Sequence, residues 1–307
     1  MTRQLDDAAL RERGLPMPDD DADKEGRGDV LVVAGSREVP GAARLAATAA
    51  LRAGAGRLLL AVPQSIALAM GLAVPEARVI ALPETADGGL SEDGLRLLEP
   101  VAGRMDGVVA GPGLMDEPAT VRFVRGLLDR FDAPFVLDAL ALAAGPKAAR
   151  ANVVVTPHAG EMAHLTGLAK DAIQARPGHE AREASDRWGV GVVLKGATTW
   201  LAFPGEADWR HDDGDVGLAT SGSGDTLAGI LGGLLARGVP PFDAALWAVR
   251  LHALAGERLV RRHGRLGYLA RELGDEVPAA MHRLCSAGEA QAGGAPGSGD
   301  PSASSSA

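Results

Sequence analysis

The chain has 307 residues, a formal net charge of -9 at pH 7 and 46% hydrophobic residues. This composition is that of a globular protein, and the negative charge argues against sequence-independent binding to nucleic acid, which needs a basic surface. A single cysteine, Cys285, cannot form an internal disulfide or a multi-cysteine metal site. No apolar stretch reaches the roughly 20 residues of a membrane-spanning helix, and no signal sequence is visible, so we predict a soluble, cytoplasmic protein.

The two ends of the chain differ in composition from its middle. Residues 1–28 are charged and include an acidic DDDAD run, so we expect an arm or an irregular lead-in. Residues 286–307 are rich in Gly, Ser, Ala and Pro and have little to bury, which predicts a disordered tail. Residues 29–285 are then expected to form a single domain.

Short β-branched runs alternate with helical patterns in this middle part. Most runs are continuously apolar, which is typical of parallel strands covered on both faces. The predicted strands of this kind are 31–35, 57–62, 77–82, 107–111, 134–139, 152–157 and 190–196. Helices are expected at 42–54 and 117–131, and a hairpin from 199–205 to 209–214 adds an antiparallel edge. The pattern predicts an α/β, three-layer α/β/α fold with a mostly parallel, doubly wound sheet.

In such sheets ligands bind beyond the carboxyl ends of the strands. The segments that follow the predicted strands include LDALAL, TPHAGE and KGATT, which carry Asp138, His158, Glu161 and Lys195. Lys195 is a candidate for a nucleotide phosphate, although a solvated lysine would fit too. Asp138 could support a metal or a donor phosphate, or cap a loop. His158 is short of metal partners and favours a polar contact to a ligand, and Glu161 could open a helix.

The stretch GLATSGSGDTLAGILGGLLARG, residues 217–238, predicts a buried helix with a glycine-rich start. Apolar residues recur every three or four positions from Leu227 to Leu235, and Gly238 is a suitable residue to follow the helix end. The first N–H groups of a helix lack intrahelical partners and carry partial positive charge, so small residues there let an anion approach. The predicted anion hole consists of Gly222, Ser223 and Gly224. A shorter glycine turn at 111–113 is either a tight turn or a close approach of a ligand to the backbone.

Asp225 is the unusual member of this stretch. The helix N-terminus favours its ionised form. A carboxylate beside a phosphate site would accept the proton of a hydroxyl group that attacks phosphorus, which is general-base catalysis of phosphoryl transfer. The alternative is that Asp225 only interacts with the helix dipole and that the glycines only form a turn.

Six spaced motifs together resemble those of the ADP-dependent (S)-NAD(P)H-hydrate dehydratases, metabolite-repair lyases of the ribokinase-like superfamily. The resemblance covers about residues 24–284. In chain order the motifs read AGSREVPGAARLAATAALRAGAGRLLLAVP, AGPGL, VLDALAL, VVVTPHAGEMAHLTG, VVLKGATTWLAF and GLATSGSGDTLAGILGGLLARG.

The resemblance implies that hydrated NADH or NADPH (NADHX or NADPHX) is dehydrated at the expense of ADP, giving AMP and phosphate. Phosphorylation of the C6 hydroxyl would precede loss of phosphate, with Asp225 as the base. It also implies Mg²⁺, a homotetramer and a separate NAD(P)H-hydrate epimerase for the R hydrate. ATP in place of ADP stays open, as does the preference between NADHX and NADPHX.

Carried over by position, the hydrate contacts are Ala42, Gly113, His158 and Asp225. The adenine-nucleotide contacts are Lys195, Gly196, Ala197, Thr198, Thr199 and Gly224. Two positions depart from the family pattern: Leu140 stands where many relatives have a second acidic residue, and Ser223 replaces a threonine. The metal ligands therefore stay unassigned. The rival interpretations are an ATP-dependent small-molecule kinase of the same superfamily and a non-catalytic nucleotide sensor.

Overall fold

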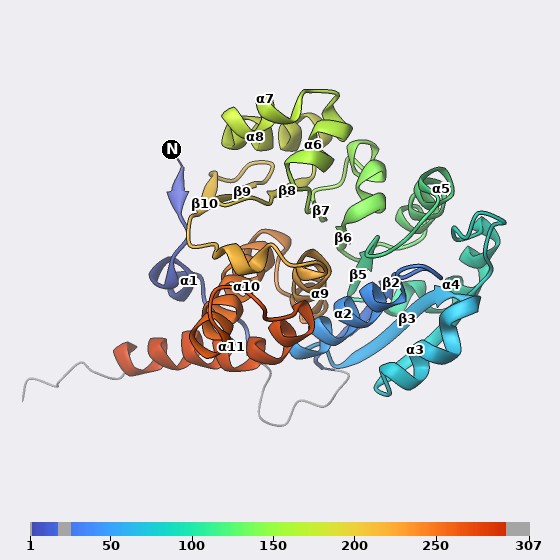
Figure 1. The fold of residues 1–307 in the computed structure, drawn as a ribbon, viewed down its shortest axis with the longest axis horizontal. Helices are drawn as coiled ribbons and strands as arrows, with labels where there is room; N and C mark the ends of the chain where they lie inside the picture. The colour runs from blue at the N-terminus through green and yellow to red at the C-terminus, as the bar shows by residue number, and fades with distance from the viewer. Residues whose placement is uncertain (1, 18–25, 293–307) are drawn as a thin grey trace, which may run out of the picture.

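The computed structural model describes residues 2–17 and 26–292, and within them a single sheet has ten strands in the order β1-β10-β9-β8-β7-β6-β5-β2-β3-β4 (Figure 1). All neighbouring strands are parallel except β9, which is antiparallel to both β8 and β10. The strands are β1 (Arg3–Gln4), β2 (Asp29–Val33), β3 (Arg57–Pro63), β4 (Ala77–Leu82), β5 (Gly107–Ala110), β6 (Phe135–Leu137), β7 (Val153–Val155), β8 (Gly191–Leu194), β9 (Thr199–Ala202) and β10 (Trp209–His211).

Helices cover both faces of the sheet, which makes three layers (Figure 1). One apolar core lies between the sheet and the layer of α1 (Asp7–Arg13), α2 (Pro40–Arg52), α3 (Ala67–Ala73), α9 (Ser223–Ala236), α10 (Pro241–His263) and α11 (Ala270–Ala292). The other core lies beneath α4 (Leu95–Leu98), α5 (Glu117–Leu128), α6 (Ala159–Thr166), α7 (Lys170–Ala175), α8 (Pro177–Trp188) and the 3₁₀ segment Ala139–Lys147. The side chains of β2 alternate between the two cores, because Val30 and Val32 face one and Leu31 and Val33 the other.

The glycines of α9 allow close packing against the neighbouring elements. A Cβ on Gly229 would lie 2.2 Å from the carbonyl oxygen of Ala46 in α2, and one on Gly233 would lie 2.3 Å from that of Ala50. A Cβ on Gly232 would lie 2.0 Å from a methyl group of Val109 in β5. The repeated glycines therefore place α9 deep between α2 and the sheet, so that its N-terminus opens at the carboxyl ends of the central strands.

The predicted fold class, the seven parallel strands and the antiparallel hairpin are confirmed, with boundaries that differ by a few residues. The expectation of an arm or irregular lead-in over residues 1–28 is wrong for 3–13, which form β1 and α1. Leu5 and Leu10 there are completely buried, so this segment is part of the folded domain.

The disorder predicted from residue 286 differs from the structure too, because α11 continues to Ala292. Its last residues are mostly good helix formers, such as Ala, Glu and Gln. The rest of the predicted tail, 293–307, and the acidic run at 19–23 lie outside the described residues. No helix in residues 2–17 and 26–292 combines the length and the apolar character needed to cross a membrane.

Candidate active site

A cavity of about 760 Å³ lies at the carboxyl ends of the strands, beside the N-terminus of α9. Residues from distant parts of the chain line it, and most of the predicted site residues are among them. The predicted residues in its lining are Asp138, His158, Glu161, Lys195, Gly196, Ala197, Thr199, Gly222, Ser223, Gly224 and Asp225.

The N-terminus of α9 presents free backbone donors to this cavity. Gly222 precedes the helix in a left-handed conformation, with φ of +89°, and α9 has no side-chain cap. The N–H of Ser223 donates to the carbonyl of Thr220, whereas the N–H groups of Gly224 and Asp225 have no acceptor within the described part of the chain. An anion at this helix N-terminus would therefore be bound by the N–H groups of Gly224 and Asp225 rather than by that of Ser223.

Lys195 follows β8 and lies among carboxylates. Its ammonium group donates to Asp138 Oδ1 at 2.9 Å and is 3.9 Å from Glu161 Oε2. Burial favours a lower pKa for Lys195, but the charges of Asp138, Glu161 and Asp225 more than offset it, so the pKa lies above its ordinary value. A Cβ on Gly224 would be 3.3 Å from Nζ of Lys195, which places this cation directly beside the N-terminus of α9.

Asp138 does not use its carboxylate to cap the segment that follows it. The carboxylate accepts hydrogen bonds from Thr156 Oγ1, at 2.7 Å, and from Lys195. The loop-cap alternative is therefore not the role of this side chain, which is 4% exposed and orients the lysine.

The pKa of Asp225 is raised to about 6, chiefly by burial and also by the charge of Asp138, while Lys195 acts in the opposite direction. We expected the helix N-terminus to favour the ionised form, but desolvation and carboxylate repulsion outweigh it. A carboxylate with this pKa is still mostly ionised at neutral pH and is a stronger base than an ordinary aspartate.

His158 and Glu161 form a capping box at the start of α6. Nδ1 of His158 accepts from the N–H groups of Gly160 and Glu161 at 3.0 and 3.1 Å, and Glu161 Oε2 accepts from the N–H of His158 at 2.7 Å. Because Nδ1 is an acceptor, the neutral ring carries its proton on Nε2. His158 therefore has a helix-capping role and still offers one donor at the cavity, where its side chain is 58% exposed.

Sequence reasoning missed a contact at the start of α9, between Ser223 and His252. His252 belongs to α10, and its Nε2 lies 2.9 Å from Ser223 Oγ and 3.1 Å from the carbonyl oxygen of Ser223. Burial lowers the pKa of His252 to about 4, so the ring is neutral. The sequence offered one sign of this contact with Ser223, namely a histidine within the apolar pattern of a long helix.

Three predicted contacts lie outside the cavity lining. Ala42 and Gly113 pack against each other, since a Cβ on Gly113 would be 2.5 Å from that of Ala42, which is 2% exposed. Thr198 donates to Asp212 at 2.9 Å. At Gly111, with φ of +123°, the close neighbour is the backbone of Asp138, because a Cβ there would be 1.8 Å from its carbonyl oxygen.

No group of three or more His, Cys, Asp or Glu side chains suited to hold a metal ion exists among residues 2–17 and 26–292. Asp138, the closest candidate, already binds Lys195 and Thr156. The donors present fit only an ion that keeps water and phosphate oxygens as most of its ligands, which is how Mg²⁺ binds beside nucleotides.

The three-layer architecture with a doubly wound, mostly parallel sheet defines a ribokinase-like fold. A protein of the ribokinase-like superfamily from Enterococcus faecalis shares this fold, with a TM-score of 0.79 and 24% identity over 92% of this chain and 96% of that one.

The chain belongs to the NAD(P)H-hydrate dehydratase family, whose sequence model matches residues 30–279. It is 46% identical to the ADP-dependent (S)-NAD(P)H-hydrate dehydratase of Xanthomonas campestris over 92% of this chain and 97% of that protein. A crystal structure of the Bacillus subtilis ADP/ATP-dependent NAD(P)H-hydrate dehydratase, co-crystallised with ATP and Mg²⁺, has a TM-score of 0.78 and 30% identity over 92% and 99% of the two chains. A bifunctional NAD(P)H-hydrate repair enzyme of Moorella thermoacetica is 39% identical, and the match spans 54% of its length.

Proposed function

We propose that this protein is an ADP-dependent (S)-NAD(P)H-hydrate dehydratase that restores hydrated NADH or NADPH with consumption of ADP. The observation that carries the proposal is the position of Asp225, a carboxylate with a pKa of about 6 at the mouth of an anion hole beside Lys195. The family and the names of the relatives supply the substrate class.

The first step is phosphoryl transfer. The C6 hydroxyl of the hydrate attacks the β-phosphorus of ADP, its proton goes to Asp225, and AMP leaves with the bridging oxygen. The N–H groups of Gly224 and Asp225 stabilise the charge on the transferred group, and the ammonium of Lys195 neutralises phosphate oxygens. In the second step the ring nitrogen donates its electron pair, the C6–O bond breaks, and phosphate departs. Loss of a proton from C5 then restores the double bond.

The cation and the nucleotide contacts are part of the same proposal. Lys195, Gly196, Ala197, Thr198, Thr199 and Gly224 are proposed to bind the nucleotide, and Ala42, Gly113, His158 and Asp225 the hydrate. Mg²⁺ would be held mainly by phosphate oxygens and water, with Asp138 as the nearest carboxylate, and would supply charge neutralisation. The Bacillus subtilis relative co-crystallised with ATP and Mg²⁺ supports this choice.

Three further features are proposals that rest on the family: a homotetramer, a cytoplasmic location, and cooperation with a separate NAD(P)H-hydrate epimerase that converts the R hydrate. The relatives named bifunctional repair enzymes support the last of these, since the match to this chain spans 54% and 53% of their length in two examples.

Absorbance at 340 nm tests the proposal, because only the restored nicotinamide absorbs there. Purified protein, Mg²⁺ and the S hydrate should give a rise in absorbance that depends on ADP or ATP, and the faster nucleotide identifies the donor. Asp225→Asn should lower turnover by roughly 10²- to 10⁴-fold, the usual contribution of a general base, while ADP still binds.

Consumption of ADP or ATP without a rise in absorbance at 340 nm would contradict the dehydratase. It would favour the small-molecule kinase, which keeps the phosphate on its product. Unchanged turnover in Asp225→Asn would remove this carboxylate from the mechanism.

A further inference from the structure

One wall of the cavity is the segment 211–215, which begins at the last residue of β10. His211, Gly214 and Asp215 line the cavity, and Asp212 Oδ1 accepts a hydrogen bond from Thr198. A Cβ on Gly214 would lie 3.2 Å from the carbonyl oxygen of Ala197. The segment 211–215, here called the nucleotide wall, thus packs directly on the KGATT loop.

The N-terminal segment, residues 3–13, fixes the strand that leads into the nucleotide wall. It lies outside residues 30–279, the part that the family model matches. β1 pairs with β10 in parallel, with Gln4 beside Arg210, and the N–H of Leu5 donates to the carbonyl of Arg210 at 2.8 Å. Gln4 Oε1 also accepts from Arg210 Nε at 3.1 Å. β1 therefore holds β10 at the last residue before the wall begins.

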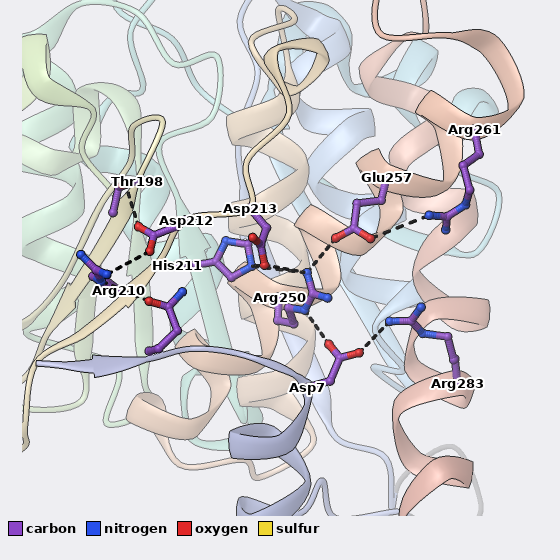
Figure 2. A network of polar contacts seen from close by, with 11 residues as sticks. Asp7, Thr198, Arg210, His211, Asp212, Asp213, Arg250, Glu257, Arg261 and Arg283 are labelled. Carbon is purple, nitrogen blue, oxygen red and sulfur yellow. Dashed lines mark hydrogen bonds and ion pairs between the residues drawn. The ribbon is translucent and has the colours of Figure 1, made fainter.

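Arg250 of α10 connects the same segment to the wall itself (Figure 2). Its Nε donates to Asp7 Oδ1 at 2.7 Å, and its Nη1 donates to Glu257 at 2.8 Å and lies 3.4 Å from Nε2 of His211. Because arginine can only donate, Nε2 of His211 is the acceptor in that contact. Asp213 is 4.0 Å from Nη1.

The two central side chains of this network, Arg250 and His211, are buried. The side chain of Arg250 is 9% exposed and His211 is 2% exposed. Burial and the charge of Arg250 lower the pKa of His211, so the ring stays neutral and Asp7 and Glu257 are the close counter-charges of the arginine. Asp7 is held in turn by Arg283 of α11 at 2.8 Å. If Asp7 lost its charge, Arg250 would be drawn toward the remaining carboxylates, Glu257 and Asp213, and the position of His211 would change with it.

We infer that Asp7 and Arg250 are positioning residues for nucleotide binding, and that the N-terminal segment acts through them and through β1 to hold the nucleotide wall against the KGATT loop. The inference rests on the proposed function in one respect, namely that the KGATT loop binds the adenine nucleotide.

The test is the affinity for ADP of the full chain carrying Asp7→Asn, measured by calorimetry, together with steady-state KM values for ADP and for the hydrate. We expect ADP binding to weaken by roughly 2- to 30-fold, the range for substitutions that act through a contact network, with a matching rise in the KM for ADP. The KM for the hydrate should not change, because the proposed hydrate contacts, Ala42, Gly113, His158 and Asp225, include no residue of the nucleotide wall. Asp212→Asn, which acts on the wall from the exposed side, should weaken ADP binding in the same way.

Glu276→Gln is the matched control. Glu276 is a buried carboxylate that pairs with Arg258 and Arg262 between α10 and α11, away from the nucleotide wall. It should lower thermal stability but leave ADP affinity as in the wild type. Unchanged ADP affinity in Asp7→Asn would overturn the inference while leaving the proposed function intact, and unchanged affinity in Asp212→Asn would show that the wall does not support the nucleotide. Failure of the wild type to bind ADP would overturn the proposed nucleotide site and the inference with it.

Discussion

The ammonium group of Lys195 lies 2.9 Å from Asp138, and its charge also lowers the pKa of Asp225. One lysine at a strand end therefore interacts with two carboxylates from other elements. Glu161, at 3.9 Å, is a third carboxylate around the same cation. An anionic nucleotide could not approach three uncompensated carboxylates. Even before any phosphate is bound, Lys195 therefore keeps Asp225 available as a base near neutral pH, because it lowers the pKa of that carboxyl.

Substitution of Lys195 should move the pH dependence of turnover. The wild-type rate should rise as the pH passes through about 6, because Asp225 must lose its proton to act as the base. In Lys195→Met the lowering effect of the lysine on the pKa of Asp225 is lost while that of burial and Asp138 remains, so the pKa rises further. We expect the midpoint of the pH–rate profile, at saturating nucleotide, to move to higher pH.

The KM for the nucleotide should rise as well in Lys195→Met, so the midpoint rather than the rate at one pH is the decisive reading. A midpoint that stays at the wild-type value would show that Lys195 does not tune the base.

The contact between Ser223 and His252 leads to a second prediction. Neutral His252 holds the hydroxyl and the carbonyl of Ser223 in place at the anion hole. In addition to the N–H groups of Gly224 and Asp225, we expect the Ser223 hydroxyl to donate to the transferred group, so Ser223→Ala should lower kcat by on the order of 100-fold, whereas Ser223→Thr should retain most activity. His252→Ala should have a smaller effect in the same direction.

A double-mutant cycle checks whether the two residues act together. If His252 works by orienting the Ser223 hydroxyl, the loss in the double variant should be less than the sum of the two single losses in free-energy terms. Additive losses would instead assign His252 an independent role.

The fold was predictable from sequence because the seven parallel strands read as continuous apolar runs. Six of them are buried on both faces, and the seventh, β4, is a partly exposed edge strand. The hairpin was predicted from the run TWLAFPG followed by WRHDDG. β1 has two residues, Arg3 and Gln4, both exposed, and so has neither of these patterns. Its pairing with β10 depends on tertiary contacts of Leu5 and α1, which no local pattern indicates.

Within the site, the residues that follow strands or open α9 were predictable, because a sheet of this kind brings those positions together. The polar residues of α10 were not. Arg250 and His252 occur within an apolar helical pattern and are separated from their partners Asp7 and Ser223 by 243 and 29 positions. Two polar side chains inside such a pattern were the available hint, but their partners depend on how α10 packs.

Gly111 leads to a prediction that links stability to the site. With φ of +123° it adopts a conformation that side-chain-bearing residues rarely take, and a Cβ would be 1.8 Å from the carbonyl oxygen of Asp138. Gly111→Ala should therefore lower the free energy of unfolding by roughly 2–6 kcal/mol, the sum of backbone strain and overpacking, and should displace Asp138 from Lys195, which weakens ADP binding in the protein that remains folded.

Gly205→Ala is the control, because Gly205 also has a positive φ, +77°, but nothing within 4 Å of an added Cβ. It should cost only about 1–2 kcal/mol and leave ADP binding intact. Chemical denaturation and ADP titration of both variants measure the two effects separately. Equal losses of stability in the two variants would show that the Asp138 backbone yields readily, and normal ADP binding by folded Gly111→Ala would show that the position of Asp138 does not depend on this glycine.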